Sequence, residues 1–252
     1  MIIGHRGASA VAPENTLAAF ERAFDDGADG IELDVRLARD GVPVVIHDAT
    51  LRRTGSTRGI VEEMTSSELR EVEVGTWFNR ANPKRARAKY AEEQVPTLEM
   101  VFDLCRQRQG RIYVELKTVQ SASSEHLIVS VSELIRKFRY QRRVIIVSFD
   151  HRSLVAAKSL APSLCTGALF APRRGVTGWR TETILAAASA CGAGEILLHR
   201  LVARNHLVEK CIQRGFPVVV WTVDDPKWIS RAQALGIHAL ISNNPVKLLA
   251  IS

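Results

Sequence analysis

Val144-Ile145-Ile146-Val147 is a continuous apolar run that ends at the polar Ser148, and a helical pattern follows it over Leu154–Leu160. Uninterrupted apolar runs are typical of parallel strands that are buried on both faces. A parallel neighbour in the same sheet needs a long crossover connection, which is usually a helix. The stretch therefore predicts an α/β fold built from repeated strand and helix units.

Short apolar segments recur along the chain, with helical patterns between them. The eight predicted strands are Ile2–His5, Gly30–Val35, Arg111–Leu116, Val144–Phe149, Cys165–Phe170, Glu195–His199, Val218–Val223 and Ala239–Ser242. Eight such units in 252 residues, without a Pro/Gly/Ser-rich linker, predict a single (β/α)8 TIM barrel domain over residues 1–252. A doubly wound sheet is the alternative. Polar residues at the carboxyl ends of the strands favour the barrel, because barrel active sites are built there.

The segment of residues 48–94 is too long for a simple loop. We expect them to form an insertion after the second strand, at the mouth of the barrel. Within it, Gly75-Thr76-Trp77-Phe78 either lines the cleft or anchors the insertion to the barrel.

Two carboxylates share one face of the predicted strand Ile31–Val35. Alternate side chains of a strand point to the same face, so Glu32 and Asp34 lie about 6 to 7 Å apart. Carboxylates this close repel each other, and a hard cation such as Mg²⁺ or Ca²⁺ would turn the repulsion into a binding site. Glu115 is a natural third ligand, and Lys117 on the same face is suited to neutralise a phosphate oxygen. The alternative is a structural salt-bridge cluster.

The segment 42–47 is expected to fold back on the second strand as a hairpin. Only residues 36–41 separate the two, whereas a parallel neighbour needs a dozen or more. A turn at residues 38–41 would pair Glu32 with His47. This register returns His47 to the carboxylates.

His5 and His47 are candidates for an acid and base pair, because imidazole near neutral pH can take either role. Considered singly, each is better explained as a hydrogen-bonded structural residue, but the two together with the carboxylates favour catalysis. Arg6 is suited to bidentate contact with a phosphate, and a structural role at a strand end is its alternative. Asn15 would hold His5 or the ligand, or serve as a turn residue before the helix that Thr16 caps.

Aromatic residues at the ends of later strands are weaker candidates. Trp221 and His199 would form part of the pocket wall, or ordinary packing. Phe149 is expected in the core.

The net charge of +7 and the pI near 9.5 favour anionic small molecules, nucleic acid or an anionic membrane surface as partners, without choosing among them. The basic run Lys84–Lys89 is interpreted as a solvated loop. The cysteines at 105, 165, 191 and 211 lack CxxC spacing and are interpreted as reduced core residues. Met1 leads directly into the first strand, which leaves no room for a signal peptide, so a cytoplasmic protein is expected.

Several motifs together resemble a known family, in order and across nearly the entire chain. They are His5-Arg6-Gly7, Glu14-Asn15-Thr16, Glu32-Leu33-Asp34-Val35, His47-Asp48, Pro96-Thr97-Leu98-Glu99, Glu115-Leu116-Lys117, Ser148-Phe149 and Trp221-Thr222-Val223. This pattern is similar to the glycerophosphodiester phosphodiesterase family. The resemblance implies a (β/α)8 barrel with an insertion that hydrolyses glycerophosphodiesters to sn-glycerol 3-phosphate and an alcohol, with one divalent cation.

The resemblance also implies roles for residues at matching positions. The family's metal ligands correspond to Glu32, Asp34 and Glu115. Its acid and base pair corresponds to His5 and His47, and its phosphate contacts correspond to Arg6 and Lys117.

One departure from the family pattern lies near the last strand. The family usually has a Thr-Asp-x-Pro ending there, whereas this chain has Ser242-Asn243-Asn244-Pro245. This departure removes a carboxylate from the mouth of the barrel.

The resulting hypothesis is metal-dependent hydrolysis of glycerophosphodiesters within glycerol and lipid metabolism, with the substrate-binding residues Arg6, Lys117, Asn15 and Trp221. The nucleophile is water or a hydroxyl of the substrate's own glycerol. The alternatives are a lysophospholipase D acting at a membrane surface and a non-catalytic phosphodiester-binding barrel. A small-molecule substrate is the expected partner rather than nucleic acid, and membrane contact is left open without being indicated. The sequence does not indicate the head group, the metal or the oligomeric state.

Overall fold

Short strands alternate with helices in the computed structural model, which describes residues 1–55, 57–118, 122–172 and 179–250. The strands are β1 (Ile2–His5), β2 (Gly30–Leu37), β3 (Pro43–Val45), β4 (Arg111–Leu116), β5 (Val144–Ser148), β6 (Cys165–Phe170), β7 (Glu195–His199), β8 (Val218–Trp221) and β9 (Ala239–Ser242). The α-helices are α1 (Leu17–Asp25), α2 (Ser66–Leu69), α3 (Thr76–Ala81), α4 (Leu98–Leu104), α5 (Ala122–Phe138), α6 (His151–Leu160), α7 (Thr181–Ala190), α8 (Asn205–Gln213), α9 (Lys227–Leu235) and α10 (Pro245–Leu249). The 3₁₀ helices are η1 (Val61–Glu63), η2 (Pro83–Arg85), η3 (Ala88–Glu92) and η4 (Cys105–Gln107).

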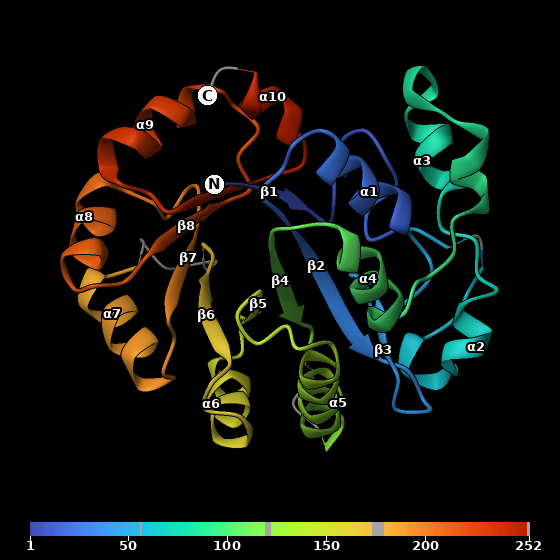
Figure 1. The fold of residues 1–252 in the computed structure, drawn as a ribbon, viewed down its shortest axis with the longest axis horizontal. Coiled ribbons are helices and arrows are strands. Elements are labelled where there is room, and N and C mark those ends of the chain that lie inside the picture. Colours follow the sequence, from blue (N-terminus) through green and yellow to red (C-terminus); the bar gives the residue numbers. More distant parts are fainter. Residues whose placement is uncertain (56, 119–121, 173–178, 251–252) are drawn as a thin grey trace.

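Eight parallel strands close into a barrel, with the helices outside it (Figure 1). The strand order is β1-β9-β8-β7-β6-β5-β4-β2, and β1 also pairs with β2, which completes the ring. An open doubly wound sheet would leave two edge strands unpaired. The predicted (β/α)8 barrel is therefore confirmed, and the alternative sheet is excluded.

The strand at residues 144–148 shows why its apolar run is uninterrupted. Ile145 and Val147 pack inside the barrel, in a cluster with side chains from the other strands. Val144 and Ile146 point the other way and pack against the outer helices. Both faces of the strand are buried, so neither face contains polar residues until the strand ends.

One polar pair lies among the apolar side chains inside the barrel. The hydroxyl of Tyr113 on β4 donates a hydrogen bond of 2.9 Å to Oε2 of Glu195, the first residue of β7. Burial raises the pKa of the Glu195 carboxyl, with Tyr113 acting in the opposite direction. Each side chain thus satisfies a polar group of the other that water does not reach.

We expect Tyr113→Phe to lower the free energy of unfolding by about 1–3 kcal/mol, because it leaves the buried Glu195 oxygen without its donor. Urea denaturation of the two proteins measures the difference. Glu195→Gln is the matched control, since its amide oxygen still accepts from Tyr113, and a smaller loss is expected. A change below about 0.5 kcal/mol in Tyr113→Phe would contradict the prediction.

The segment between β3 and α4 contains α2 and α3 and lies at one side of the barrel, on the right in Figure 1. Its own apolar cluster includes Leu51, Val61 and Leu69, together with Val44 of β3. The aromatic motif of this segment acts as an anchor. Phe78 is buried against alanines of the α1 region and packs edge-on against another ring of the segment.

The hairpin of β2 and β3 is antiparallel, as predicted, but the predicted register is wrong by one residue. Leu37 pairs with Pro43 rather than with Val42. The backbone N–H of Ala38 donates to the carbonyl of Val42 at 3.0 Å, and Gly41 has a φ of +80°. The connection thus contains one residue more than the expected turn, with glycine in the left-handed conformation that such loops require.

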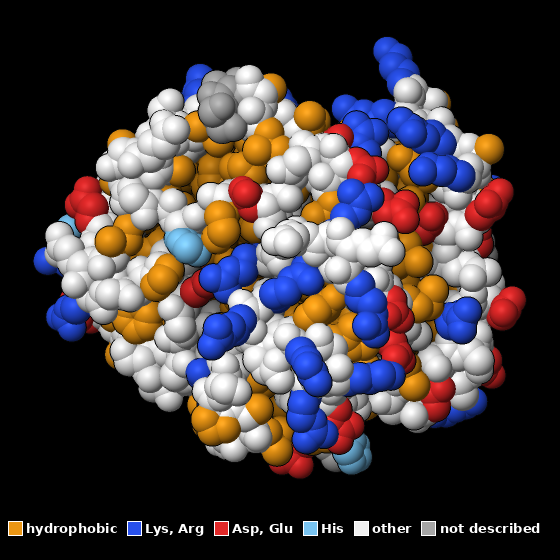
Figure 2. Space-filling view, viewed as in Figure 1, with side chains coloured by type: hydrophobic (Ala, Val, Ile, Leu, Met, Phe, Trp, Pro, Cys, Tyr) orange, Lys and Arg blue, Asp and Glu red, His pale blue; other side chains and the backbone are white. Residues whose placement is uncertain are grey.

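Figure 2 shows Lys and Arg side chains over β4, α4 and α5 on the face that it presents. A shallow hollow beside the amino ends of β4 and β5 is lined in part by arginines 106, 108, 111, 142 and 143. Arg108 pairs with Asp25 at 2.9 Å, and Arg143 donates to three backbone carbonyls. Arg108 and Arg143 are therefore engaged in contacts within the protein.

The four cysteines are free thiols, and all except Cys165 are buried, which agrees with the interpretation as reduced core residues. Within the described ranges, no helix has both the length and the apolar character needed to cross a bilayer.

Candidate active site

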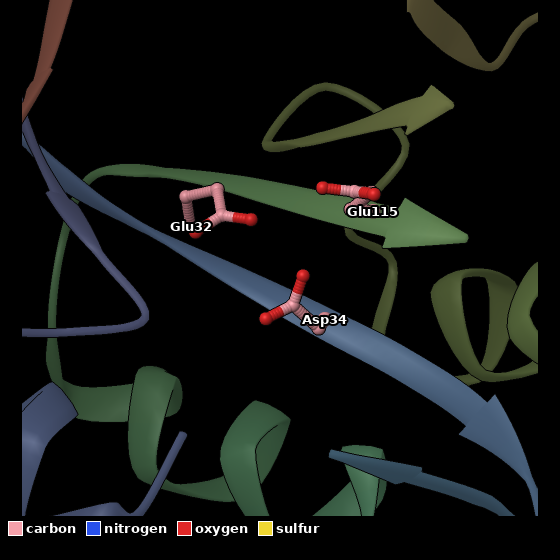
Figure 3. A group of neighbouring side chains, drawn as sticks. All are labelled: Glu32, Asp34 and Glu115. Carbon is pink, nitrogen blue, oxygen red and sulfur yellow. The ribbon is translucent and has the colours of Figure 1, made fainter. Parts of the chain in front are cut away.

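Three carboxylates converge at the mouth of the barrel. Glu32 and Asp34 lie on the same face of β2, and Asp34 pairs in register with Glu115 of the neighbouring β4. Figure 3 shows the three side chains turned toward one another. One oxygen from each lies within 4.8 Å of the others, and all three residues are buried. Strand alternation and parallel pairing of β2 with β4 are sufficient to produce this arrangement.

Two positively charged side chains contact the carboxylate of Asp34. Lys117 Nζ lies 3.0 Å from Asp34 Oδ1, and Arg6 Nε lies 3.1 Å from Asp34 Oδ2. Asn15 Nδ2 also donates to Oδ2 at 2.8 Å. Burial alone would raise the pKa of Asp34, but Lys117 and Arg6 hold this pKa below its usual value. Asp34 is therefore ionised.

The pKa values of the other two carboxyl groups, those of Glu32 and Glu115, are shifted upward. Burial, followed by the negative charges of Asp34 and Glu115, raises the pKa of Glu32 well above its usual value. Burial and Asp34 also raise the pKa of Glu115 to about 7, although Lys117 lies 2.5 Å from it. The positive charges of Lys117 and Arg6 do not balance the negative charges of three carboxylates. A further positive charge is needed for all three to ionise together.

The first imidazole lies at the end of β1. Nδ1 of His5 is 2.6 Å from Oδ1 of Asn243, and Nε2 is 3.9 Å from Oε2 of Glu32. Burial, and then the charge of Arg6, lowers the pKa of His5 to about 4. His5 is thus neutral at physiological pH and can accept a proton.

The second imidazole follows β3. Nδ1 of His47 is 2.6 Å from Oδ1 of Asp48, and its backbone carbonyl accepts a hydrogen bond from Arg36 Nε at 2.9 Å. Burial, together with the positive charges of Lys117 and Arg6, lowers the pKa of His47, although the charge of Asp34 and the hydrogen bond to Asp48 act in the opposite direction. The shifted hairpin register does not remove His47 from the site, since it still borders the same cavity as Glu32.

A cavity of about 360 Å³ connects these groups. The residues that line it are His5, Arg6, Glu32, His47, Glu115, Lys117, Val147, Phe149, Leu169, Leu197, Trp221, Thr222 and Ile241. The titratable residues belong to the part of the chain before residue 118, and the lining residues after it are mostly apolar. One side of the cavity is therefore suited to a charged group and the other side to a carbon skeleton.

Phe149 is not a core residue, which corrects the expectation from the sequence. It is 45% exposed and lines the cavity. Its ring packs edge-on against the ring of Trp221, with the ring centroids 5.6 Å apart. Its position directly after the carboxyl end of β5 was the available signal, because side chains at that end of a barrel strand face the mouth. The ring of His199 also packs edge-on against Trp221, with the ring centroids 5.1 Å apart, and His199 is not among the described lining residues.

Asn15 and Arg6 are placed by the loop that precedes α1. Thr16 caps this helix by accepting a hydrogen bond from Ala19 N at 3.2 Å. The Asn15 side chain contacts both the carboxylate and the backbone N–H of Asp34, and among the described residues it does not border the cavity. Asn15 therefore orients the carboxylate of Asp34. The expected contact with His5 is not among the contacts of the described residues.

Sequence reasoning missed a set of acidic partners around the site. Glu14 accepts hydrogen bonds from Arg6 at 2.8 Å and from Arg53 of the inserted segment at 2.7 Å. Arg53 also contacts Asp48, the partner of His47. The adjacent motifs Glu14-Asn15-Thr16 and His47-Asp48 contained both acids, but only the folded chain shows that Arg53 joins them.

The whole chain matches known proteins. Residues 5–247 match the model of the family described as "Glycerophosphoryl diester phosphodiesterase family". A glycerophosphodiester phosphodiesterase of Caldanaerobacter subterraneus subsp. tengcongensis is 35% identical over 99% of this chain and 96% of its own length. A glycerophosphodiester phosphodiesterase of Bacillus subtilis is 31% identical over 97% of this chain and 84% of its own length.

Solved structures agree with these relatives. An Oleispira antarctica phosphodiesterase in complex with the product sn-glycerol-3-phosphate is similar, with a TM-score of 0.87, 26% identity and coverage of 100% of this chain and 96% of that chain. A glycerophosphodiester phosphodiesterase from Agrobacterium tumefaciens is similar with a TM-score of 0.80, 28% identity and coverage of 99% and 98%.

Proposed function

Because the chain belongs to the glycerophosphoryl diester phosphodiesterase family, we propose that it releases sn-glycerol 3-phosphate and an alcohol from glycerophosphodiesters by acid and base catalysis beside a bound cation. The observation that carries the proposal is a single cavity bordered by the acidic cluster and by both imidazoles. The product of the Oleispira antarctica relative has the expected chemistry.

The acidic cluster fits a divalent cation of the Mg²⁺ or Ca²⁺ type. Glu32, Asp34 and Glu115 supply only oxygen ligands, which these cations prefer. Burial and the neighbouring negative charges raise the pKa values of Glu32 and Glu115, and a cation between them would favour their ionised forms. When bound there, the cation would neutralise charge on the phosphoryl oxygens.

The remaining charged residues are suited to hold the phosphate. Lys117 and the guanidinium of Arg6 border the cavity next to the carboxylates. Both are paired with acids in the structure, so a phosphate would share rather than replace these contacts. In this position they would hold the phosphorus next to the two imidazoles.

His5 and His47 carry the proton transfers. One imidazole takes the proton of the attacking hydroxyl, and the other gives a proton to the oxygen of the leaving alcohol. In this way the hydroxyl becomes a better nucleophile and the alcohol leaves without a charge.

Trp221 would contact the substrate's carbon skeleton or one of its oxygens. Its indole Nε1 is buried and has no hydrogen-bond partner among the described residues. Burying a donor without an acceptor is unfavourable, and a substrate hydroxyl would satisfy it.

A substrate panel tests the proposed function. We expect release of sn-glycerol 3-phosphate from glycerophosphocholine or glycerophosphoethanolamine in buffer with Mg²⁺ or Ca²⁺, measured by a coupled glycerol 3-phosphate dehydrogenase assay. Turnover only on lysophosphatidylcholine would instead identify a lysophospholipase D. Binding of the diesters without turnover would identify a non-catalytic binding barrel.

A further inference from the structure

Asn243 directly follows β9 and contacts His5 across the seam between β1 and β9. β1 and β9 are neighbouring strands, in which Gly4 pairs with Ser242. The residues that follow this pair, His5 and Asn243, are therefore adjacent too. Nδ1 of His5 lies 2.6 Å from Oδ1 of Asn243. An amide oxygen occupies the position beside this imidazole.

The amide of Asn243 is itself held by Asp224, in the loop after β8. Asp224 Oδ2 accepts a hydrogen bond of 2.8 Å from Asn243 Nδ2. Asp224 Oδ1 accepts hydrogen bonds from Asn243 N and from Ser242 Oγ, also at 2.8 Å. Both carboxylate oxygens thus act as acceptors, and this fixes which end of the amide faces Asp224.

The orientation of the amide determines the proton position on His5. If the amide were turned over, Asn243 Oδ1 would face Asp224 Oδ2, and two acceptors would be in contact. Oδ1 therefore faces His5, where Ser9 Oγ also donates to it at 3.1 Å. An amide oxygen only accepts, so Nδ1 of His5 must carry a hydrogen.

We propose that Asp224 and Asn243 are positioning residues that fix the Nδ1–H tautomer of His5. The lone pair of the neutral ring is then on Nε2, the nitrogen on the side of Glu32 and the cavity. In the reaction, Nε2 takes the proton of the attacking hydroxyl while the proton on Nδ1 stays in place. This inference rests on the proposed role of His5 and extends it to two residues that do not touch the substrate.

Asp224→Asn is expected to turn the Asn243 amide over, while the shape of the side chain at position 224 hardly changes. The new amide must keep its oxygen toward Ser242 Oγ and the backbone N–H of Asn243, so its NH₂ group faces Asn243 Nδ2. Two donors in contact turn the Asn243 amide over, and its NH₂ group then faces His5 Nδ1. We expect kcat to fall by about tenfold to a hundredfold with KM changed by less than about threefold.

The double variant Asp224→Asn/Asn243→Asp is the matched rescue. The amide at 224 then donates to the carboxylate at 243, whose other oxygen accepts from His5 Nδ1. Every hydrogen bond of the wild type has a counterpart, so we expect kcat within about threefold of the wild type. Ser9→Ala is the control, because it removes a different donor to the same oxygen, and its kcat should be unchanged.

A spectroscopic measurement tests the tautomer without activity. ¹⁵N NMR of the histidine rings, with the signals of His5 identified by their absence in His5→Gln, should show hydrogen on Nδ1 in the wild type and in the double variant. In Asp224→Asn the hydrogen should move to Nε2. An inactive wild type with hydrogen on Nδ1 would refute the proposed function and leave the positioning role intact.

Two results would overturn the inference. One is an Asp224→Asn variant that keeps both the wild-type kcat and hydrogen on Nδ1. The other is a loss of kcat in that variant that Asn243→Asp does not restore, when thermal unfolding shows that both proteins are folded. If the single variant does not fold, the folded double variant still decides, since its kcat and its Nδ1 hydrogen must both match the wild type.

Discussion

Removal of the divalent cation with EDTA is expected to abolish release of sn-glycerol 3-phosphate, and Glu32→Ala is expected to lower kcat by at least about a hundredfold. Glu32 is buried beside Asp34 and Glu115, and burial and these two charges raise its pKa well above its usual value. A cation bound between the three carboxylates would favour the ionised form of Glu32. Activity with and without EDTA, followed by addition of Mg²⁺ or Ca²⁺, measures the effect.

Glu32→Gln separates cation binding from folding. The amide has the shape of the protonated carboxyl, so this variant should fold as well as the wild type. A ligand that binds only the folded protein raises the melting temperature, and we expect Mg²⁺ or Ca²⁺ to do so for the wild type and much less for the variant. A near-normal kcat in Glu32→Ala would remove this residue from the mechanism.

His47→Ala is expected to lower kcat by at least about a hundredfold on glycerophosphocholine, because the site then lacks one of its two proton-transfer groups. KM should change much less, since Arg6, Lys117 and Trp221 still line the cavity. Steady-state kinetics of this variant and of His5→Ala provide the comparison. Full activity of His47→Ala would show that its contact with Asp48 is structural only.

A second substrate assigns the two proton-transfer roles. A 4-nitrophenyl leaving group departs without protonation, so loss of the acid should cost little on a glycerophospho-4-nitrophenyl ester. Loss of the base should cost the same on both substrates. Because His5 is the proposed base, we expect His47→Ala to recover on the aryl ester and His5→Ala not to recover, and recovery of both would exclude a division into acid and base.

The barrel could be predicted because its signal is local. Runs such as Val144–Val147 are apolar on both faces, and each predicted strand overlaps an observed one with differences of at most two residues at an end. The hairpin register could not be predicted at the same level. It depends on whether Gly41 adopts a left-handed conformation, and the residue type alone does not decide the length of the turn.

Part of the candidate site follows from the same local rules. Glu32 and Asp34 share a face because strands alternate, and Glu115 joins them because β2 and β4 are parallel neighbours. The partners of these groups depend on loops that meet only in the folded chain. His5 and Asn243 are separated by 238 positions, and no spacing pattern in the sequence links them.

The seam between β1 and β9 has a consequence for synthesis of the protein. Of the described strands, β1 leaves the ribosome first, but it pairs with β9, which leaves last. His5 therefore meets Asn243 only after β9 has left the ribosome. Interrupted translation would yield fragments in which the acids of β2 and β4 are already present while the first imidazole lacks its partner.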